Sequence, residues 1–273
     1  MRPFKDKAVL ITGAGRGIGK RLAIGFAAEG ARVGLLARSK AELDLADLEI
    51  EHAGGSSLRL RADVRNYEQM TAAVERMRST YGGVHILICA AGIQGPIGPV
   101  AETGHKEWAE TLEVNLIGAM HACRTVLPQM MDRRSGKIIL LSGGGAEGPR
   151  PNFSAYAASK TALVRFAECL AEEVADHNIQ VNCMDPGATY TNITDEILRA
   201  GDRAGRREAE EAAYVRTNGG ASPDSQISLA LFLASERSNH ISGKLIHVDD
   251  DWRKMEHANV RTGNFTLRRL AKA

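Results

Sequence analysis

The sequence predicts an α/β fold with a doubly wound, seven-stranded parallel sheet, helices on both faces and a single domain. Seven short runs rich in Val, Ile and Leu alternate with longer amphipathic segments, and no repeat or low-complexity linker divides the chain. Strands that are nearly continuous in apolar residues are covered on both faces, and their alternation with helices is typical of a parallel sheet. With 273 residues and 44% hydrophobic residues, the chain can bury one large core.

The expected elements follow each other as strand–helix units, which right-handed crossovers bring into one sheet. The strand-like runs are Ala8–Ile11, Ala31–Leu36, Ser57–Leu60, Val84–Cys89, Lys137–Leu141, Ile179–Cys183 and Lys244–Val248. Six amphipathic segments with helical periodicity separate them: Gly19–Glu29, Ala41–Ala53, Tyr67–Tyr81, Trp108–Met131, Ala155–His177 and Asp224–Ala234.

Two segments depart from this alternation. Thr191–Gly220 is highly charged and follows a strand, so we expect a helical flap that faces a ligand at the carboxyl ends of the strands. We assign 1–250 to the domain and 251–273 to a basic tail. After Trp252 the tail has a single acidic residue, Glu256. Its cations are Arg253, Lys254, Arg261, Arg268, Arg269 and Lys272.

Two interpretations of these charges remain open. Tail arginines and the flap residues Arg203, Arg206 and Arg207 could bind an anionic substrate, such as a phosphorylated or nucleotide-linked sugar or an acyl carrier. Alternatively, the tail packs across a subunit boundary, and the flap arginines pair at helical spacing with nearby acidic residues. Those acidic residues are Glu208, Glu210 and Glu211.

Composition excludes several classes of protein. A net charge of +2 gives no global reason to bind nucleic acid or an anionic membrane, and no run of about 18 apolar residues could span a bilayer. The N-terminus lacks the pattern of a secretory signal. The four cysteines are widely spaced, so we expect reduced thiols and a cytoplasmic protein. The carboxylates of Asp249–Asp251 are contiguous and cannot all point at one ion, so we expect no metal site.

A glycine-rich turn, residues 13–19, joins the first strand to the first helix. Its glycines permit positive φ and close approach of the backbone to a pyrophosphate, while the helix N-terminus supplies free N–H groups. A purely structural tight turn is the alternative, but the position between strand and helix favours a dinucleotide site. No Lys-Ser/Thr follows the glycines, which disfavours a P-loop NTPase.

The end of the second strand indicates which dinucleotide binds. NAD enzymes usually present a carboxylate there to the ribose 2′-hydroxyl, whereas a 2′-phosphate requires a cation. Here Arg38 occupies this place, and Arg16 could face the same group. Between the end of the second strand and Glu42 there is no carboxylate. The sequence therefore predicts NADP(H) in preference to NAD(H), unless Arg38 only caps a surface turn.

Tyr156 and Lys160 form an i, i+4 pair at the start of a helix. This spacing places the two side chains on one face, where an ammonium group can lower the pKa of the phenol from its ordinary value of about 10. A phenol with such a pKa could exchange a proton during catalysis. The same spacing alone also occurs by chance in surface helices.

With these elements in order, the chain resembles the short-chain dehydrogenase/reductase family from about Lys7 to Val248. The matching elements are Thr12-Gly13-x-x-x-Gly17-x-Gly19, Asp63-Val64, Ala91-Gly92, Asn115, Tyr156-x-x-x-Lys160 and Pro186-Gly187-x-x-x-Thr191. The resemblance implies a Rossmann-type fold, a nicotinamide cofactor, hydride transfer to or from a carbonyl or secondary alcohol, and a homo-oligomer. That dimer or tetramer would be built on the helices containing Asn115 and Tyr156.

The resemblance also implies roles for single residues. Tyr156 would be the general acid or base, Lys160 would bind the nicotinamide ribose and lower the pKa of the tyrosine, and Asn115 would hold a proton-relay water. Independently, Asn is unfavourable within a helix, so Asn115 either has a functional or bridging role or faces solvent. The expected cofactor contacts are Gly13, Arg16, Gly17, Ile18, Gly19, Arg38, Asp63, Val64, Ala90, Ala91, Gly92, Tyr156, Lys160, Pro186, Gly187, Thr189 and Thr191.

The sequence departs from the family pattern in two places. Cys89-Ala90-Ala91-Gly92 stands where the family has Asn-Asn-Ala-Gly, and the serine that binds the substrate carbonyl is replaced by Gly143. Ser142 could take this role, backbone N–H groups of the glycines could replace it, or carbonyl chemistry could be compromised. The missing serine favours one alternative to a dehydrogenase, a nucleotide-binding regulator without turnover. A nucleotide-sugar epimerase or dehydratase is the second alternative.

Overall fold

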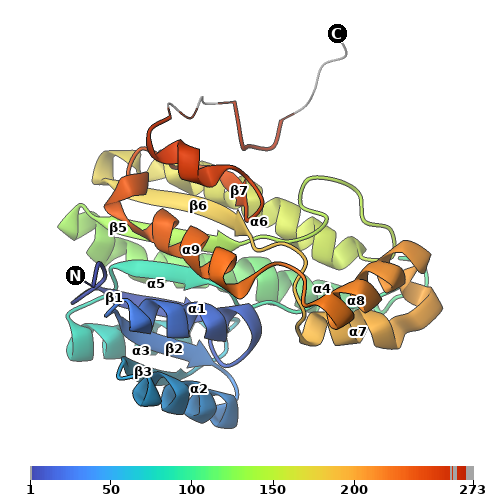
Figure 1. The fold of residues 1–273 in the computed structure, drawn as a ribbon, viewed down its shortest axis with the longest axis horizontal. Helices are drawn as coiled ribbons and strands as arrows, with labels where there is room; N and C mark the ends of the chain where they lie inside the picture. Colours follow the sequence, from blue (N-terminus) through green and yellow to red (C-terminus); the bar gives the residue numbers. More distant parts are fainter. Residues whose placement is uncertain (1, 259, 261–262, 269–273) are drawn as a thin grey trace.

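Seven parallel strands form one sheet in the order β3-β2-β1-β4-β5-β6-β7 (Figure 1). This computed structural model describes residues 2–258, 260 and 263–268. The strands are β1 (Ala8–Thr12), β2 (Arg32–Ala37), β3 (Ser56–Arg61), β4 (Ile86–Cys89), β5 (Gly136–Leu141), β6 (Ile179–Asp185) and β7 (Leu245–His247). The predicted single-domain, doubly wound Rossmann-type sheet is confirmed.

Helices cover both faces because adjacent strand residues point to opposite sides. Val9 and Ile11 of β1 pack on one side, with α1 (Gly17–Ala28), α2 (Lys40–His52) and α9 (Pro223–Ala234). On the other side Ala8 and Leu10 pack towards α3 (Tyr67–Tyr81), α5 (Gly118–Arg133) and α6 (Ser154–Glu173). The nearly unbroken apolar strands of the sequence are therefore buried on both faces.

The long helix predicted over Trp108–Met131 has three parts. The first part is α4 (His105–Leu112), and a π-helical turn over Glu113–Ile117 joins it to α5. Such π turns widen a helix locally and often occur at functional sites. Asn115 lies in the middle of this turn.

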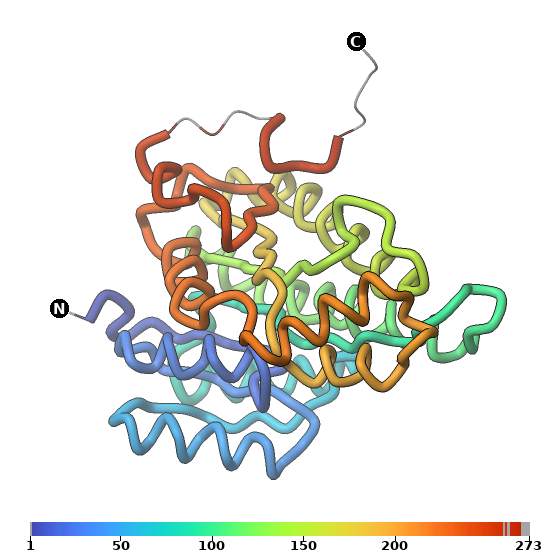
Figure 2. Tube along the Cα trace, turned by 45° about the vertical axis from the view of Figure 1, so that its right-hand side comes forward, coloured from blue at the N-terminus to red at the C-terminus, as the bar shows by residue number. Residues whose placement is uncertain are grey.

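The expected flap consists of α7 (Asn192–Ala200) and α8 (Arg206–Asn218), which lie together at the carboxyl ends of the strands (Figures 1 and 2). Ile197, Ala204 and Ala212 form a small separate apolar cluster with the fully buried Phe153. We call the segment from α7 through α8 the lid. These few apolar anchors agree with the highly charged sequence of this segment.

The described parts of the tail pack on their own chain, beside the edge strand β7 and α6 (Figure 2). The backbone N–H of Leu245 donates to the carbonyl oxygen of Phe265 at 2.7 Å, and that of Leu267 donates to Glu168 at 2.8 Å. Trp252 and Met255 are buried in the core. The packed domain thus extends past residue 250. In the described part of the chain, no helix has both the length and the apolar character needed to cross a membrane.

Candidate active site

A cavity of about 1060 Å³ opens where the strands end and the lid begins. This volume lies at the upper end of the range for ligand sites in proteins. It brings together every predicted cofactor contact and Ser142, whereas Asn115 is not in its wall. Ligand sites in open α/β sheets lie at this edge, so the location agrees with the expectation from sequence.

The glycine-rich turn forms the floor of one half of the cavity. Gly13 has φ +68°, and a Cβ atom there would lie 2.7 Å from backbone atoms of Ala91. No side chain caps the N-terminus of α1, which begins at Gly17. Backbone N–H groups at this uncapped end suit an anion such as a pyrophosphate.

Charged side chains surround the end of β2. Arg38 is exposed and lies in the cavity wall, and Arg16 forms an ion pair with Glu42 at 3.5 Å. Asp63 is bound by the Arg65 guanidinium, which lowers the pKa of its carboxyl. The turn after β2 therefore presents the exposed Arg38, whereas Arg16 of the glycine-rich turn already pairs with Glu42.

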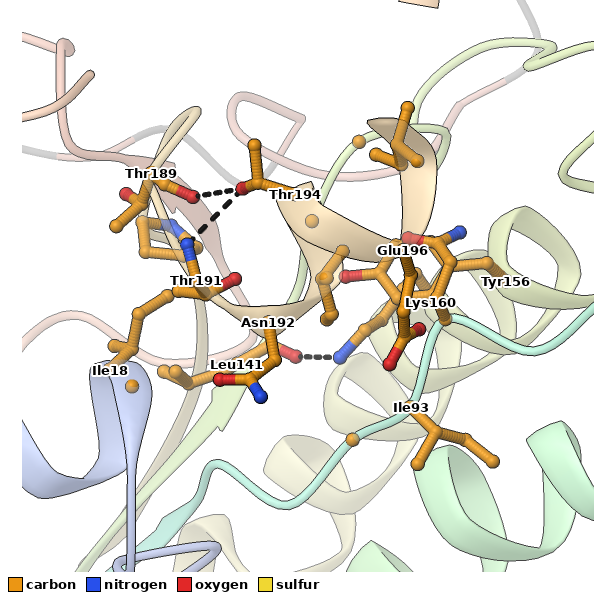
Figure 3. A pocket seen from close by; sticks show the side chains of 18 of the residues that line it. Ile18, Ile93, Leu141, Tyr156, Lys160, Thr189, Thr191, Asn192, Thr194 and Glu196 are labelled. Carbon is orange, nitrogen blue, oxygen red and sulfur yellow. Dashed lines mark hydrogen bonds between the residues drawn. The ribbon is translucent and has the colours of Figure 1, made fainter. Parts of the chain in front are cut away.

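Tyr156 and Lys160 extend from the first turns of α6 into the other half of the cavity (Figure 3). Lys160 Nζ lies 5.5 Å from the Tyr156 ring centroid and donates to the carbonyl oxygen of Leu141 at 2.7 Å. Burial raises the pKa of Tyr156 to about 12 and lowers that of Lys160 to about 8. The expected lowering of the tyrosine pKa by Lys160 is not seen, because desolvation dominates and Arg150 is the cation that opposes it.

Asn115 holds the loop after β4 rather than facing solvent or the cavity. Its Oδ1 accepts from the N–H of Ile93 at 2.9 Å, and its Nδ2 donates to the carbonyl oxygen of Ile93 and to Ser159 Oγ, each at 3.0 Å. Asn115 is 1% exposed. Of the two interpretations of this mid-helix Asn, the bridging one agrees with the structure.

The segment after β5 shows what the missing serine changes. A Cβ atom at Gly143 would lie 2.7 Å from the Tyr156 hydroxyl, so this position faces the phenol directly. Ser142 also lies in the cavity wall, and its buried hydroxyl has no hydrogen-bond partner within the described chain. Ser142 therefore retains a free hydroxyl near the position where the family has its serine.

Thr189 and Thr191 organise the start of the lid. Thr194 Oγ1 accepts from the N–H of Thr191 at 3.2 Å and donates to the carbonyl oxygen of Thr189 at 2.9 Å (Figure 3). Thr191 is the N-cap residue of α7, and both Thr189 and Thr191 border the cavity. Glu196, one turn further along α7, also lies in the wall, and burial raises the pKa of its carboxyl.

The sequence did not reveal an ion pair that fastens the lid beside the tyrosine. Arg150 donates to Glu208 of α8 through Nε at 2.9 Å and Nη2 at 2.6 Å. Its guanidinium carbon lies 4.1 Å from the Phe153 ring centroid and 5.7 Å from that of Tyr156. Both charged side chains are less than one-fifth exposed. The only sequence signal for this pair was the charge of the two residues.

Neutralising this pair should loosen the lid. We expect Glu208→Gln to accelerate tryptic cleavage after the lid arginines by about tenfold, because a buried charge-assisted bond contributes roughly 1.5–3 kcal/mol. Limited proteolysis followed by mass spectrometry measures the rate. Glu210→Gln is the matched control, since Glu210 pairs with Arg206 on the exposed face of the same helix. Equal rates for both variants would contradict the role of the Arg150–Glu208 pair.

The structure bears differently on the flap arginines and on the tail cations, the two basic segments that could bind an anionic substrate. Arg206 and Arg207 border the cavity, but Arg206 pairs with Glu210, and Arg203 donates to the carbonyl oxygen of Ile97. None of the described tail residues lies in the cavity wall. Arg261, Arg269 and Lys272 lie outside the described residues. Within the described residues, no cluster of His, Cys, Asp or Glu is arranged to hold a metal ion.

Comparison with known proteins agrees with this geometry. The family model for short chain dehydrogenases matches residues 7–201. A 2,3-dihydro-2,3-dihydroxybenzoate dehydrogenase of Bacillus subtilis (strain 168) is 31% identical over 252 residues, 90% of this chain and 95% of that protein. NAD+-bound xylitol dehydrogenase superposes with a TM-score of 0.82 at 26% identity, covering 89% of this chain and 98% of that one.

A gluconate 5-dehydrogenase of Burkholderia cenocepacia J2315, solved with NADP and tartrate, has a TM-score of 0.81 at 27% identity, covering 91% of this chain and 95% of that one. Fold and site thus define an oxidoreductase that uses a nicotinamide dinucleotide. The chain belongs to the short-chain dehydrogenase/reductase family, since the family model matches more than half of it. The family predicted from the sequence motifs is confirmed.

Proposed function

We propose that this protein transfers a hydride between NADP(H) and a carbonyl compound or secondary alcohol, with Tyr156 as general acid or base. The observation that carries this proposal is the meeting of Tyr156 and Lys160 with the glycine-rich turn in one cavity. A nicotinamide dinucleotide fits these residues: the glycine-rich turn lines the cavity, and the uncapped end of α1 can receive a pyrophosphate there. The bound cofactor would supply or accept the hydride.

The chain's own residues would handle the proton. Because the pKa of Tyr156 is raised to about 12, its phenol stays protonated at neutral pH and can donate to a carbonyl oxygen. Reduction uses the protonated phenol and oxidation uses the phenolate, so oxidation should become faster as the pH rises. Lys160 would hold the nicotinamide ribose, and Asn115 fixes the loop beside it through Ile93.

The direct test is to incubate the purified protein with NADPH and a panel of ketones and aldehydes, and to follow the absorbance of the reduced nicotinamide. Turnover of at least one carbonyl compound is expected. Binding of NADPH without turnover would overturn the proposal and favour a nucleotide-binding regulator. Conversion of a nucleotide-linked sugar with no net change in the cofactor would favour an epimerase or dehydratase. A homo-oligomer and a cytoplasmic location stay predictions.

Arg38 is proposed to select NADP(H). In Arg38→Asp we expect the preference for NADPH over NADH, measured as a ratio of kcat/KM, to fall by about 10- to 100-fold, because charge-assisted bonds to a phosphate contribute roughly 1.5–3 kcal/mol. Arg32→Asp changes the same charge at the opposite end of β2, where Arg32 is exposed and pairs with Asp6. An unchanged ratio in Arg38→Asp would remove Arg38 from this role.

Ser142 is proposed to replace the missing serine as a hydrogen-bond donor to the carbonyl oxygen. Its buried, unpartnered hydroxyl in the cavity wall supports this role. Ser142→Ala should lower kcat by tenfold or more, since removing a preorganised donor weakens the stabilisation of developing negative charge. A loss well below tenfold would leave the backbone N–H groups of Gly143–Gly145 as the donors.

A further inference from the structure

Gln94 lies at the wall of the cavity, in the loop that follows β4. It is completely buried, and neither Nε2 nor Oε1 has a hydrogen-bond partner within the described chain. A carboxamide can donate two hydrogen bonds and accept two. Buried side-chain amides are nearly always bonded, so one with both ends free requires an explanation.

A loose loop does not supply this explanation, because the backbone on both sides of Gln94 is fixed. The N–H and the carbonyl oxygen of Ile93 are both bonded to Asn115. On the other side, a Cβ atom at Gly95 would overlap the hydroxyl of the buried Thr111. The fold therefore holds Gln94 in place while its side chain stays unsatisfied, which is typical of a binding residue that is destabilising without its ligand.

The location relates Gln94 to the reacting end of the cavity. Gly92 is two residues earlier, and a Cβ atom there would lie 3.7 Å from Lys160 Nζ. Ile93, between them, borders the same part of the cavity as Lys160 and Tyr156 (Figure 3). Gly143, which also lines the cavity, provides no side chain that could orient a substrate. A polar group on the Gln94 side can supply that orientation.

We propose that the Gln94 carboxamide binds a hydroxyl group on a carbon next to the reacting carbonyl or alcohol carbon, so that the substrates are α-hydroxy ketones and vicinal diols. A hydroxyl both donates and accepts, so it can satisfy Oε1 and Nε2 together. A carboxylate only accepts; it would leave Oε1 unpaired and would share the cavity with Glu196. This inference rests on the proposed function and identifies its substrate class.

The first arm of the test needs no substrate. We expect Gln94→Met to keep or raise the melting temperature, because an apolar side chain of similar shape replaces an amide that has no partner. Gln226→Met is the matched control. Gln226 is also completely buried, but its Nε2 donates to the carbonyl oxygen of Pro186 at 2.8 Å and to Thr189 Oγ1 at 2.5 Å. Its replacement should lower the melting temperature. An equal fall in both variants would overturn the proposal.

The second arm compares 3-hydroxybutan-2-one with butan-2-one as substrates for NADPH-dependent reduction. Wild type should prefer the hydroxy ketone in kcat/KM, and Gln94→Met should reduce that preference about tenfold, mainly through KM. An unchanged preference would overturn the proposal.

If wild type reduces no carbonyl compound, the proposed function fails, and butane-2,3-diol still tests Gln94. The diol should raise the melting temperature of wild type more than butan-2-ol does, and this difference should vanish in Gln94→Met; a difference that persists overturns the inference.

Discussion

Tyr156→Phe is expected to lower kcat for carbonyl reduction by about 10²- to 10⁴-fold, the usual contribution of a positioned general acid. The substitution removes only the hydroxyl, which faces position 143 in the cavity, and leaves the ring packed beside Arg150 and Lys160. Because the pKa of this phenol is raised to about 12, wild type keeps the proton available across neutral pH. Steady-state kinetics with NADPH and a substrate from the carbonyl panel measure the loss.

Two further measurements separate lost chemistry from lost structure. The dissociation constant for NADPH and the melting temperature of Tyr156→Phe should stay close to those of wild type, because the ring is retained. Tyr190→Phe is the matched control: Tyr190 is exposed, and its hydroxyl donates to Asp195 of the lid at 3.0 Å. If Tyr156→Phe kept more than a tenth of the wild-type kcat, Tyr156 could not be the general acid.

The sheet and the nucleotide end of the site could be predicted because their signals are local in sequence. A strand buried on both faces must be apolar at nearly every position, as in Val9–Ile11 of β1. A glycine-rich turn between strand and helix is likewise readable residue by residue. The pair Tyr156 and Lys160 needs only the helical period to bring its side chains to one face.

The rest of the site depends on contacts that local patterns do not encode. Arg150 and Glu208 are separated by 58 positions, and only the folded lid brings them together. Ser159, which holds Asn115, resembles any helix residue in the sequence. The high pKa of Tyr156 arises from burial of the side chain, which no spacing rule reports. The sequence thus predicted side chains that the fold brings to one cavity, but not the environment that sets their proton affinity.

Gly19→Ala is expected to weaken NADPH binding by more than 100-fold. A Cβ atom at this position would overlap the carbonyl oxygen of Gly13 and lie 2.8 Å from its carbonyl carbon. Both are backbone atoms of the turn proposed to hold the pyrophosphate, so relief of the clash must move that turn away from α1. Isothermal titration calorimetry with NADPH measures the affinity. Overpacking at a buried site costs about 1–3 kcal/mol, so the free energy of unfolding should also fall.

Gly25→Ala separates these two effects within the same helix. Gly25 is buried in α1 as well, but a Cβ atom there would lie 2.6 Å from Cγ2 of Ile227, a side chain of α9 that can change rotamer. This variant should therefore lose stability of similar size and keep its affinity for NADPH, because the glycine-rich turn is untouched. If Gly25→Ala lost the cofactor as completely as Gly19→Ala, the loss would reflect general destabilisation of α1. The turn itself would then have no demonstrated part in binding the dinucleotide.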